Sequence, residues 1–161
     1  MTPPAAAATP PFAAPVAVLD TNTVFDWLLF HHPDGLAIGA AVAAGRLRWL
    51  ATAPMREELM HVLARGGFER WRPDPVAMAA HWARHCVEVP PPPDADPTSR
   101  FRCTDPDDQK FIDLAVTSGA RWLLTRDRAV LKLARRLREV GTEVLTPAAW
   151  AALHAGSHAT D

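Results

Sequence analysis

The chain has 161 residues, of which 48% are hydrophobic, and its formal net charge at pH 7 is −1. This length and composition predict a single globular domain, and the balanced charge excludes a generally basic nucleic-acid binder, so an RNA partner would need a local basic patch. Two cysteines without a Cys-x-x-Cys pair indicate reduced thiols and a cytoplasmic protein, and no apolar run approaches the roughly 20 residues of a membrane span.

Short apolar runs alternate with stretches of helical periodicity, beginning with a run at 16–19 whose continuous apolarity is typical of a strand buried on both faces. Before it, the Ala/Pro-rich residues 1–15 are expected to form a disordered arm, and residues 155–161 a flexible tail behind the domain at 16–154. The alternation predicts an α/β fold with a mainly parallel sheet of about four to five strands flanked by helices. Strands are expected at 16–20, 47–51, 87–89, 121–125 and 143–145, and helices at 24–30, 33–44, 54–66, 75–85, 106–118, 128–138 and 147–154.

An aspartate lies on the apolar stripe of the helix expected at 106–118. Asp105 and Pro106 suit the N-cap and first helical position, and Asp108 then shares one face with Phe111 and Ile112. A carboxylate on the buried face of a helix is costly unless it is paired or binds a metal ion. Asp108 is therefore a candidate metal ligand, and Asp105 a cap with a supporting role.

Other acids fall where ligands collect in parallel sheets, beyond the carboxyl ends of the strands. Asp20 ends the first strand, and Asp127 follows the strand at 121–125. In the helix at 54–66, Glu58 lies on the edge of the inward stripe, whereas Glu57 should face solvent. Taken singly, Asp20 and Asp127 could each be only a helix cap.

Carboxylates gathered in one pocket repel each other by about 3–4 kcal/mol per pair at 4–5 Å and an effective dielectric of about 20. A hard cation would relieve this repulsion, and oxygen ligands favour Mg²⁺ or Mn²⁺ over zinc. Asp20, Asp108 and Asp127 are the expected metal ligands, and Glu58 completes the set directly or through water. Such an ion could polarise a phosphate and activate a water for in-line attack.

Basic side chains cluster next to Asp127 and give the local patch that an RNA partner would need. The alternative is an ordinary solvated helix face. Arg65, Arg70 and Arg72 with Trp71 form a second patch, in which the Trp could stack on a base or pack in the core. The candidate RNA-binding residues of the first patch are Arg126, Arg128, Lys132 and Arg135.

The order and spacing of these motifs resemble the PIN domain, over residues 16–154, and within it the toxin components of bacterial toxin–antitoxin pairs. The resemblance implies a Rossmann-like parallel sheet and a metal-dependent ribonuclease acting on single-stranded RNA. The residues that carry it are Val18-Leu19-Asp20-Thr21-Asn22, Glu57-Glu58-Leu59 with Val62-Leu63, Asp105-Pro106-Asp107-Asp108-Gln109-Lys110-Phe111, Leu124-Thr125-Arg126-Asp127 and Val144-Leu145-Thr146-Pro147.

Matched by position, Asp20, Glu58, Asp108 and Asp127 correspond to the acidic quartet of that family, and Asn22 and Thr125 to its supporting polar positions. The resemblance also implies a small antitoxin protein that covers the acidic pocket, and it allows a homodimer. The rival interpretation is a non-catalytic PIN-like module that binds RNA or a protein partner and cleaves nothing.

Overall fold

The computed structural model describes residues 14–94 and 99–155. The arm predicted at 1–15 lies outside the described residues except for its last two, and the tail predicted at 155–161 lies outside them except for its first. Within the described ranges, none of the helices has the length and apolar character needed to cross a membrane.

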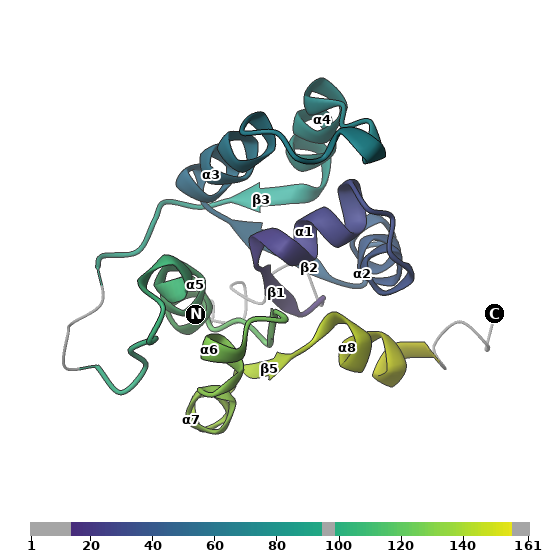
Figure 1. Ribbon diagram of the computed structural model, residues 1–161. Coiled ribbons are helices and arrows are strands. Elements are labelled where there is room, and N and C mark those ends of the chain that lie inside the picture. The colour runs from purple at the N-terminus through teal and green to yellow at the C-terminus, as the bar shows by residue number, and fades with distance from the viewer. Residues whose placement is uncertain (1–13, 95–98, 156–161) are drawn as a thin grey trace, which may run out of the picture.

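Five parallel strands form one sheet in the order β3-β2-β1-β4-β5 (Figure 1). The central strand is the first in the chain, and its Val18 lies between Leu50 of one neighbour and Leu123 of the other. This arrangement confirms the predicted α/β fold with a parallel sheet and places the carboxyl ends of β1 and β4 side by side. The strands are β1 (Val16–Leu19), β2 (Arg48–Ala51), β3 (Cys86–Glu88), β4 (Trp122–Leu124) and β5 (Glu143–Leu145).

Helices connect the strands, with α3 and α4 beside the β3 end of the sheet and α6 and α7 beside the β5 end (Figure 1). Proline at the start of α2, α3, α4 and α8 follows a side-chain cap, as expected where the first helical N–H has no partner within the helix. The helices are α1 (Thr21–Leu28), α2 (Pro33–Ala43), α3 (Ala53–Ala64), α4 (Pro75–His85), α5 (Gln109–Ser118), α6 (Arg128–Leu131), α7 (Ala134–Arg138) and α8 (Pro147–His154), with 3₁₀ turns η2 (Glu69–Trp71) and η3 (Pro106–Asp108).

Two helices that were predicted to be continuous are each divided into two elements in the structure. The helix expected at 106–118 begins with the 3₁₀ turn η3, so α5 itself starts only at Gln109. The helix expected at 128–138 is broken at Leu133, whose N–H bonds the Val130 carbonyl three residues back in place of the fourth. Because of this tighter turn, Arg128 and Arg135 do not lie on one regular helix.

Candidate active site

Asp20 lies at the carboxyl end of β1, where it is both the N-cap of α1 and part of a cavity wall. Its Oδ1 accepts a hydrogen bond from the Thr23 N–H at 2.8 Å, and its Oδ2 accepts one from the Thr125 hydroxyl at 2.6 Å. The side chain is buried, and this burial raises the pKa of Asp20, while the hydrogen bonds from Thr125 and Thr23 oppose the rise. Asp20 therefore combines the two roles that the sequence left open, because it caps α1 and also lines the cavity.

Thr125 joins two of the acids through one hydroxyl group. The hydroxyl donates to Asp20 and accepts a hydrogen bond from the Asp127 N–H at 2.9 Å. Because Leu19 and Leu124 are paired in register, the residues that follow them, Asp20 and Thr125, are brought together at the sheet edge. Thr125 thus fixes the orientation of the Asp20 carboxylate relative to the backbone of Asp127.

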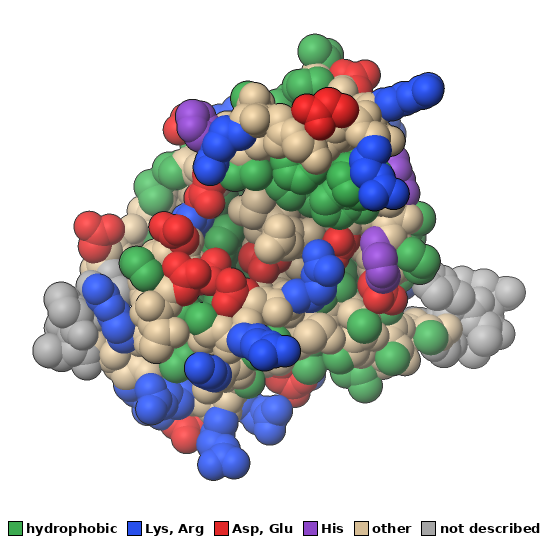
Figure 2. All heavy atoms as spheres, in the orientation of Figure 1, with side chains coloured by type: hydrophobic (Ala, Val, Ile, Leu, Met, Phe, Trp, Pro, Cys, Tyr) green, Lys and Arg blue, Asp and Glu red, His purple; other side chains and the backbone are tan. Residues whose placement is uncertain are grey.

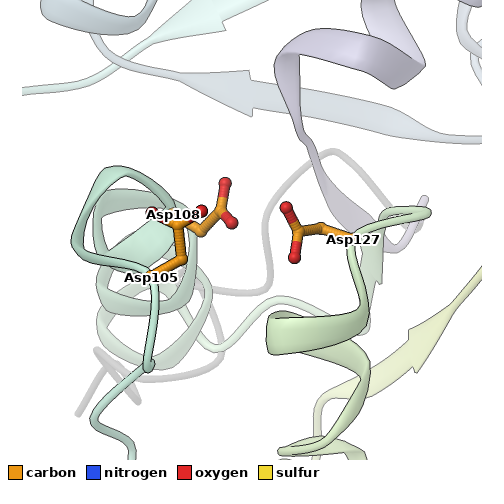
Figure 3. A group of neighbouring side chains, drawn as sticks. All are labelled: Asp105, Asp108 and Asp127. Carbon is orange, nitrogen blue, oxygen red and sulfur yellow. The ribbon is translucent and has the colours of Figure 1, made fainter.

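Three carboxylates, those of Asp105, Asp108 and Asp127, each place one oxygen so that all three oxygens lie within 4.8 Å of one another. Figure 3 shows Asp108, from η3, and Asp127, from the loop after β4, pointing toward each other. Asp127 also caps α6 through the Ala129 N–H, and Asp105 caps η3 through the Asp107 N–H. Asp105, predicted only as a cap with a supporting role, is therefore a member of this group, whereas Asp20 lies outside it and lines the adjoining cavity.

One oxygen of Asp108 shows that this group suits a cation. Oδ2 of Asp108 is buried, and it has no hydrogen-bond partner within the part of the chain that the structure describes. A buried, unpartnered carboxylate oxygen is costly, and oxygen-only surroundings of this kind suit Mg²⁺ or Mn²⁺. The residues present therefore fit the hard divalent cation that the sequence predicts.

Burial, and next the neighbouring carboxylate of Asp127, raise the pKa of Asp108 to about 7. Asp105 and Asp20 add to the rise through their charges. Near neutral pH a fraction of the Asp108 carboxyl groups is therefore protonated, and a bound cation would displace this proton. Metal affinity should accordingly increase with pH through this range.

We expect the metal-free protein to lose stability as the pH rises from about 4 to about 7. In this interval folded Asp108 retains a proton that the unfolded chain, with an aspartate pKa near 3.8, has already released. The contribution of Asp108 to the free energy of unfolding is therefore complete below about pH 4 and lost above about pH 7. Thermal melts in a chelator at pH 5 and pH 8 would measure it, and an identical pH dependence in Asp108→Asn would contradict the assignment.

The cavity beside these carboxylates has a volume of about 300 Å³. Glu58 of α3 lines it, whereas Glu57 is exposed, as the helical periodicity predicted. Asn22, a predicted supporting residue, also lines it. Its lining residues are Asp20, Thr21, Asn22, Phe25, Phe30, Glu58, Val62, Phe68, Asp105, Asp107, Asp108 and Phe111.

Two ion pairs at the site were missed from the sequence. Lys110 Nζ pairs with Glu58 Oε2, which partly neutralises the carboxylates that line the cavity. Because this pair joins α3 to α5, which are distant in the sequence, no local pattern predicts it. Arg126 Nη2 lies 3.0 Å from Oδ1 of Asp26, whose pKa is raised by burial and held back by the Arg126 charge. Arg126 thereby ties the loop that carries Asp127 to α1, and its predicted contact with RNA stays a prediction.

Lys and Arg side chains gather over α6 and α7, below the acidic group (Figure 2). Arg128, Lys132 and Arg135 are all exposed there. The basic patch therefore lies next to Asp127. Two short helices, α6 and α7, carry it in place of one continuous helix.

Comparison with known proteins assigns the chain to a family. The family model of the PIN domain matches residues 16–129, which is well over half of the chain and includes all of the acidic residues described above. No curated protein matches the chain. PIN domains are generally metal-dependent nucleases, and the parallel sheet with acids at its carboxyl edge agrees with that assignment. The protein belongs to the PIN domain family.

Proposed function

We propose that this protein is a Mg²⁺- or Mn²⁺-dependent endoribonuclease that cleaves single-stranded RNA. The observation that carries the proposal is the buried, unpartnered Oδ2 of Asp108, a residue whose side chain points toward Asp127 beside a cavity at the carboxyl edge of the sheet. A carboxylate left in this state is poised to ligate a cation, and family membership makes nuclease chemistry the expected use of that cation.

Asp105, Asp108 and Asp127 would hold the ion, while Asp20 and Glu58 face the same cavity from β1 and α3. A bound Mg²⁺ or Mn²⁺ supplies Lewis-acid activation of a phosphodiester and of the attacking water. The chain itself contributes orientation: Thr125 holds Asp20 in place, and the Asp26–Arg126 pair holds the loop of Asp127 against α1. The ion pair between Lys110 and Glu58 offsets the charge of Glu58, which limits its repulsion with the aspartates across the cavity.

RNA would approach over the basic residues of α6 and α7. Arg128, Lys132 and Arg135 are exposed beside Asp127, so their charges could neutralise phosphates on either side of the cleaved bond. Because the chain as a whole is nearly neutral, this local patch is the feature that would draw a polyanion to an acidic site.

We also propose that the protein is the toxin of a toxin–antitoxin pair, held inactive by a small protein that covers the acidic cavity. The supporting observations are the resemblance of the motifs to that branch and an open cavity whose acidic lining would receive a basic segment. Association of two copies of the chain remains a prediction from the resemblance.

The decisive experiment incubates metal-stripped protein with a mixed set of end-labelled single-stranded RNAs, with and without Mg²⁺ or Mn²⁺, beside Asp127→Asn. Cleavage should require the ion and disappear in the variant, whose side chain can still cap α6. Metal-independent products, or equal cleavage by the variant, would identify a contaminating nuclease. If the protein binds RNA but cleaves none, the non-catalytic module is the correct interpretation.

A further inference from the structure

Part of the wall of the cavity is aromatic and apolar. Phe25, Phe30, Val62 and Phe68 line it together with the carboxylates, and we call these four residues the aromatic wall. The Phe68 ring centroid lies 5.4 Å from that of Phe25 and 6.1 Å from that of Phe30. In Figure 2, hydrophobic side chains lie above the acidic group on the same face. Phe25 is buried, so the partly exposed Phe30, Val62 and Phe68 are the residues that offer a surface to a flat apolar group beside the carboxylates.

The aromatic wall continues outward to an exposed tryptophan. Trp71 packs edge to face against Phe30, with ring centroids 4.7 Å apart, and 38% of its surface is exposed. The guanidinium of Arg70 lies 4.7 Å from the centre of the Trp71 ring, and Arg65 and Arg72 are exposed in the same segment. The neighbourhood of the aromatic wall is therefore positively charged, unlike the carboxylates inside the cavity.

Neither a cation held by carboxylates nor a phosphate requires aromatic side chains for binding. The aromatic wall therefore indicates that the ligand also has a flat apolar part. In single-stranded RNA a planar base is attached one sugar away from each phosphate, and base–aromatic stacking is a common source of affinity for unpaired strands. Arginines next to an exposed tryptophan complement the neighbouring phosphates of the same strand. These charges favour a polyanion over an uncharged protein segment as the occupant.

We propose that the aromatic wall is a nucleobase subsite next to the cleaved phosphodiester bond, and that residues 65–72 guide the adjoining part of the strand. The proposal rests on the proposed ribonuclease activity and identifies how its substrate is held. Phe68 is the central residue, because it contacts both other rings of the aromatic wall and belongs to the basic segment.

The test replaces Phe68 with leucine, which keeps apolar volume and removes the ring, and with tyrosine, which keeps the ring. Single-stranded RNA oligonucleotides carrying the fluorescent base 2-aminopurine at one position each are titrated with the full chain in Ca²⁺, which slows cleavage. Phe101→Leu is the matched control, because it makes the same change of side chain at a phenylalanine that lies outside the cavity lining. Melting temperatures establish that all variants fold.

We expect quenching of 2-aminopurine at one position of the strand in the wild type and in Phe68→Tyr. Phe68→Leu should lose that quenching and bind RNA about tenfold more weakly, consistent with the usual contribution of one stacked base. An abasic site at the quenched position should remove the difference between wild type and Phe68→Leu. Phe101→Leu should behave as the wild type.

The possible results distinguish a failure of the proposed nucleobase subsite from a failure of the proposed ribonuclease activity. If Phe68→Leu binds and cleaves RNA as well as the wild type does, the subsite is overturned while the ribonuclease stands, and the aromatic wall then suits a protein partner. RNA binding that depends on Phe68 without any cleavage in Mg²⁺ or Mn²⁺ would support the subsite and refute the nuclease. If no oligonucleotide binds, the subsite is overturned as well.

Discussion

Asp108→Asn is expected to reduce RNA cleavage by at least about a thousandfold while leaving the fold intact. The variant lacks a proposed carboxylate ligand of the cation. Metal activation of phosphoryl transfer contributes several kcal/mol to the reaction, and each 1.4 kcal/mol is about tenfold in rate. Initial rates at pH 8 in saturating Mg²⁺ or Mn²⁺ measure the effect.

The stability of the same variant distinguishes a functional residue from a structural one. The metal-free wild type holds a buried, unpartnered oxygen at Asp108 next to the Asp127 carboxylate. An asparagine has the same shape, carries no charge and can donate a hydrogen bond to Asp127, so the metal-free variant should melt at the same temperature or higher at pH 8. A variant that is inactive because it has unfolded would contradict this account. Asp113→Asn, in the helix α5 that directly follows Asp108 and outside the cavity lining, is the matched control.

Gly35→Ala is expected to destabilise the protein by about 3 kcal/mol. A Cβ at Gly35 would lie 2.4 Å from the carbonyl carbon of Asp26 and 2.6 Å from the Trp27 nitrogen, both backbone atoms of α1. Backbone atoms cannot move aside as the end of a flexible side chain can, so α1 and α2 must separate. Overpacking of this kind typically costs about 1–3 kcal/mol and sometimes more. Urea unfolding of the two proteins measures the difference.

The sign of that effect is the informative result. In an unconstrained helix, replacing glycine with alanine stabilises by about 1 kcal/mol, so helix propensity alone predicts a gain where the packing predicts a loss. Ala40→Ser, at an exposed position of the same helix, should change stability by no more than about 0.5 kcal/mol. A stabilised Gly35→Ala would show that α1 and α2 are not packed this closely. Because Asp20 caps α1 and Asp26 belongs to this helix, part of the activity should be lost as well.

The sheet and much of the site could be predicted from the sequence because their signals are local. The continuous apolar run before Asp20 identifies a strand buried on both faces, and parallel strands must bring their carboxyl ends to one edge. Helical periodicity alone was enough to choose Glu58 over Glu57 as the residue that lines the cavity. Those inferences depend only on period and direction.

The rest depends on geometry that no short stretch encodes. Asp105 fits the pattern of an N-cap so well that its second position, next to Asp108 and Asp127, was underestimated. Asp108 was placed by assuming α-helical spacing from Pro106, whereas it ends a 3₁₀ turn. The Glu58–Lys110 pair and the assembly of the aromatic wall from α1, α3 and the segment before α4 arise only when distant segments pack together.

The metal site at Asp108 and its role in cleavage are tested together by a calorimetric titration of Mn²⁺ into metal-stripped protein at pH 8, with RNA cleavage measured at each metal concentration. We expect saturable binding to the wild type, cleavage that rises in parallel with occupancy, and strong losses of both in Asp108→Asn. Absence of Mn²⁺ binding, or wild-type binding by Asp108→Asn, would contradict this expectation and leave Asp20, Asp105 and Asp127 as helix caps only.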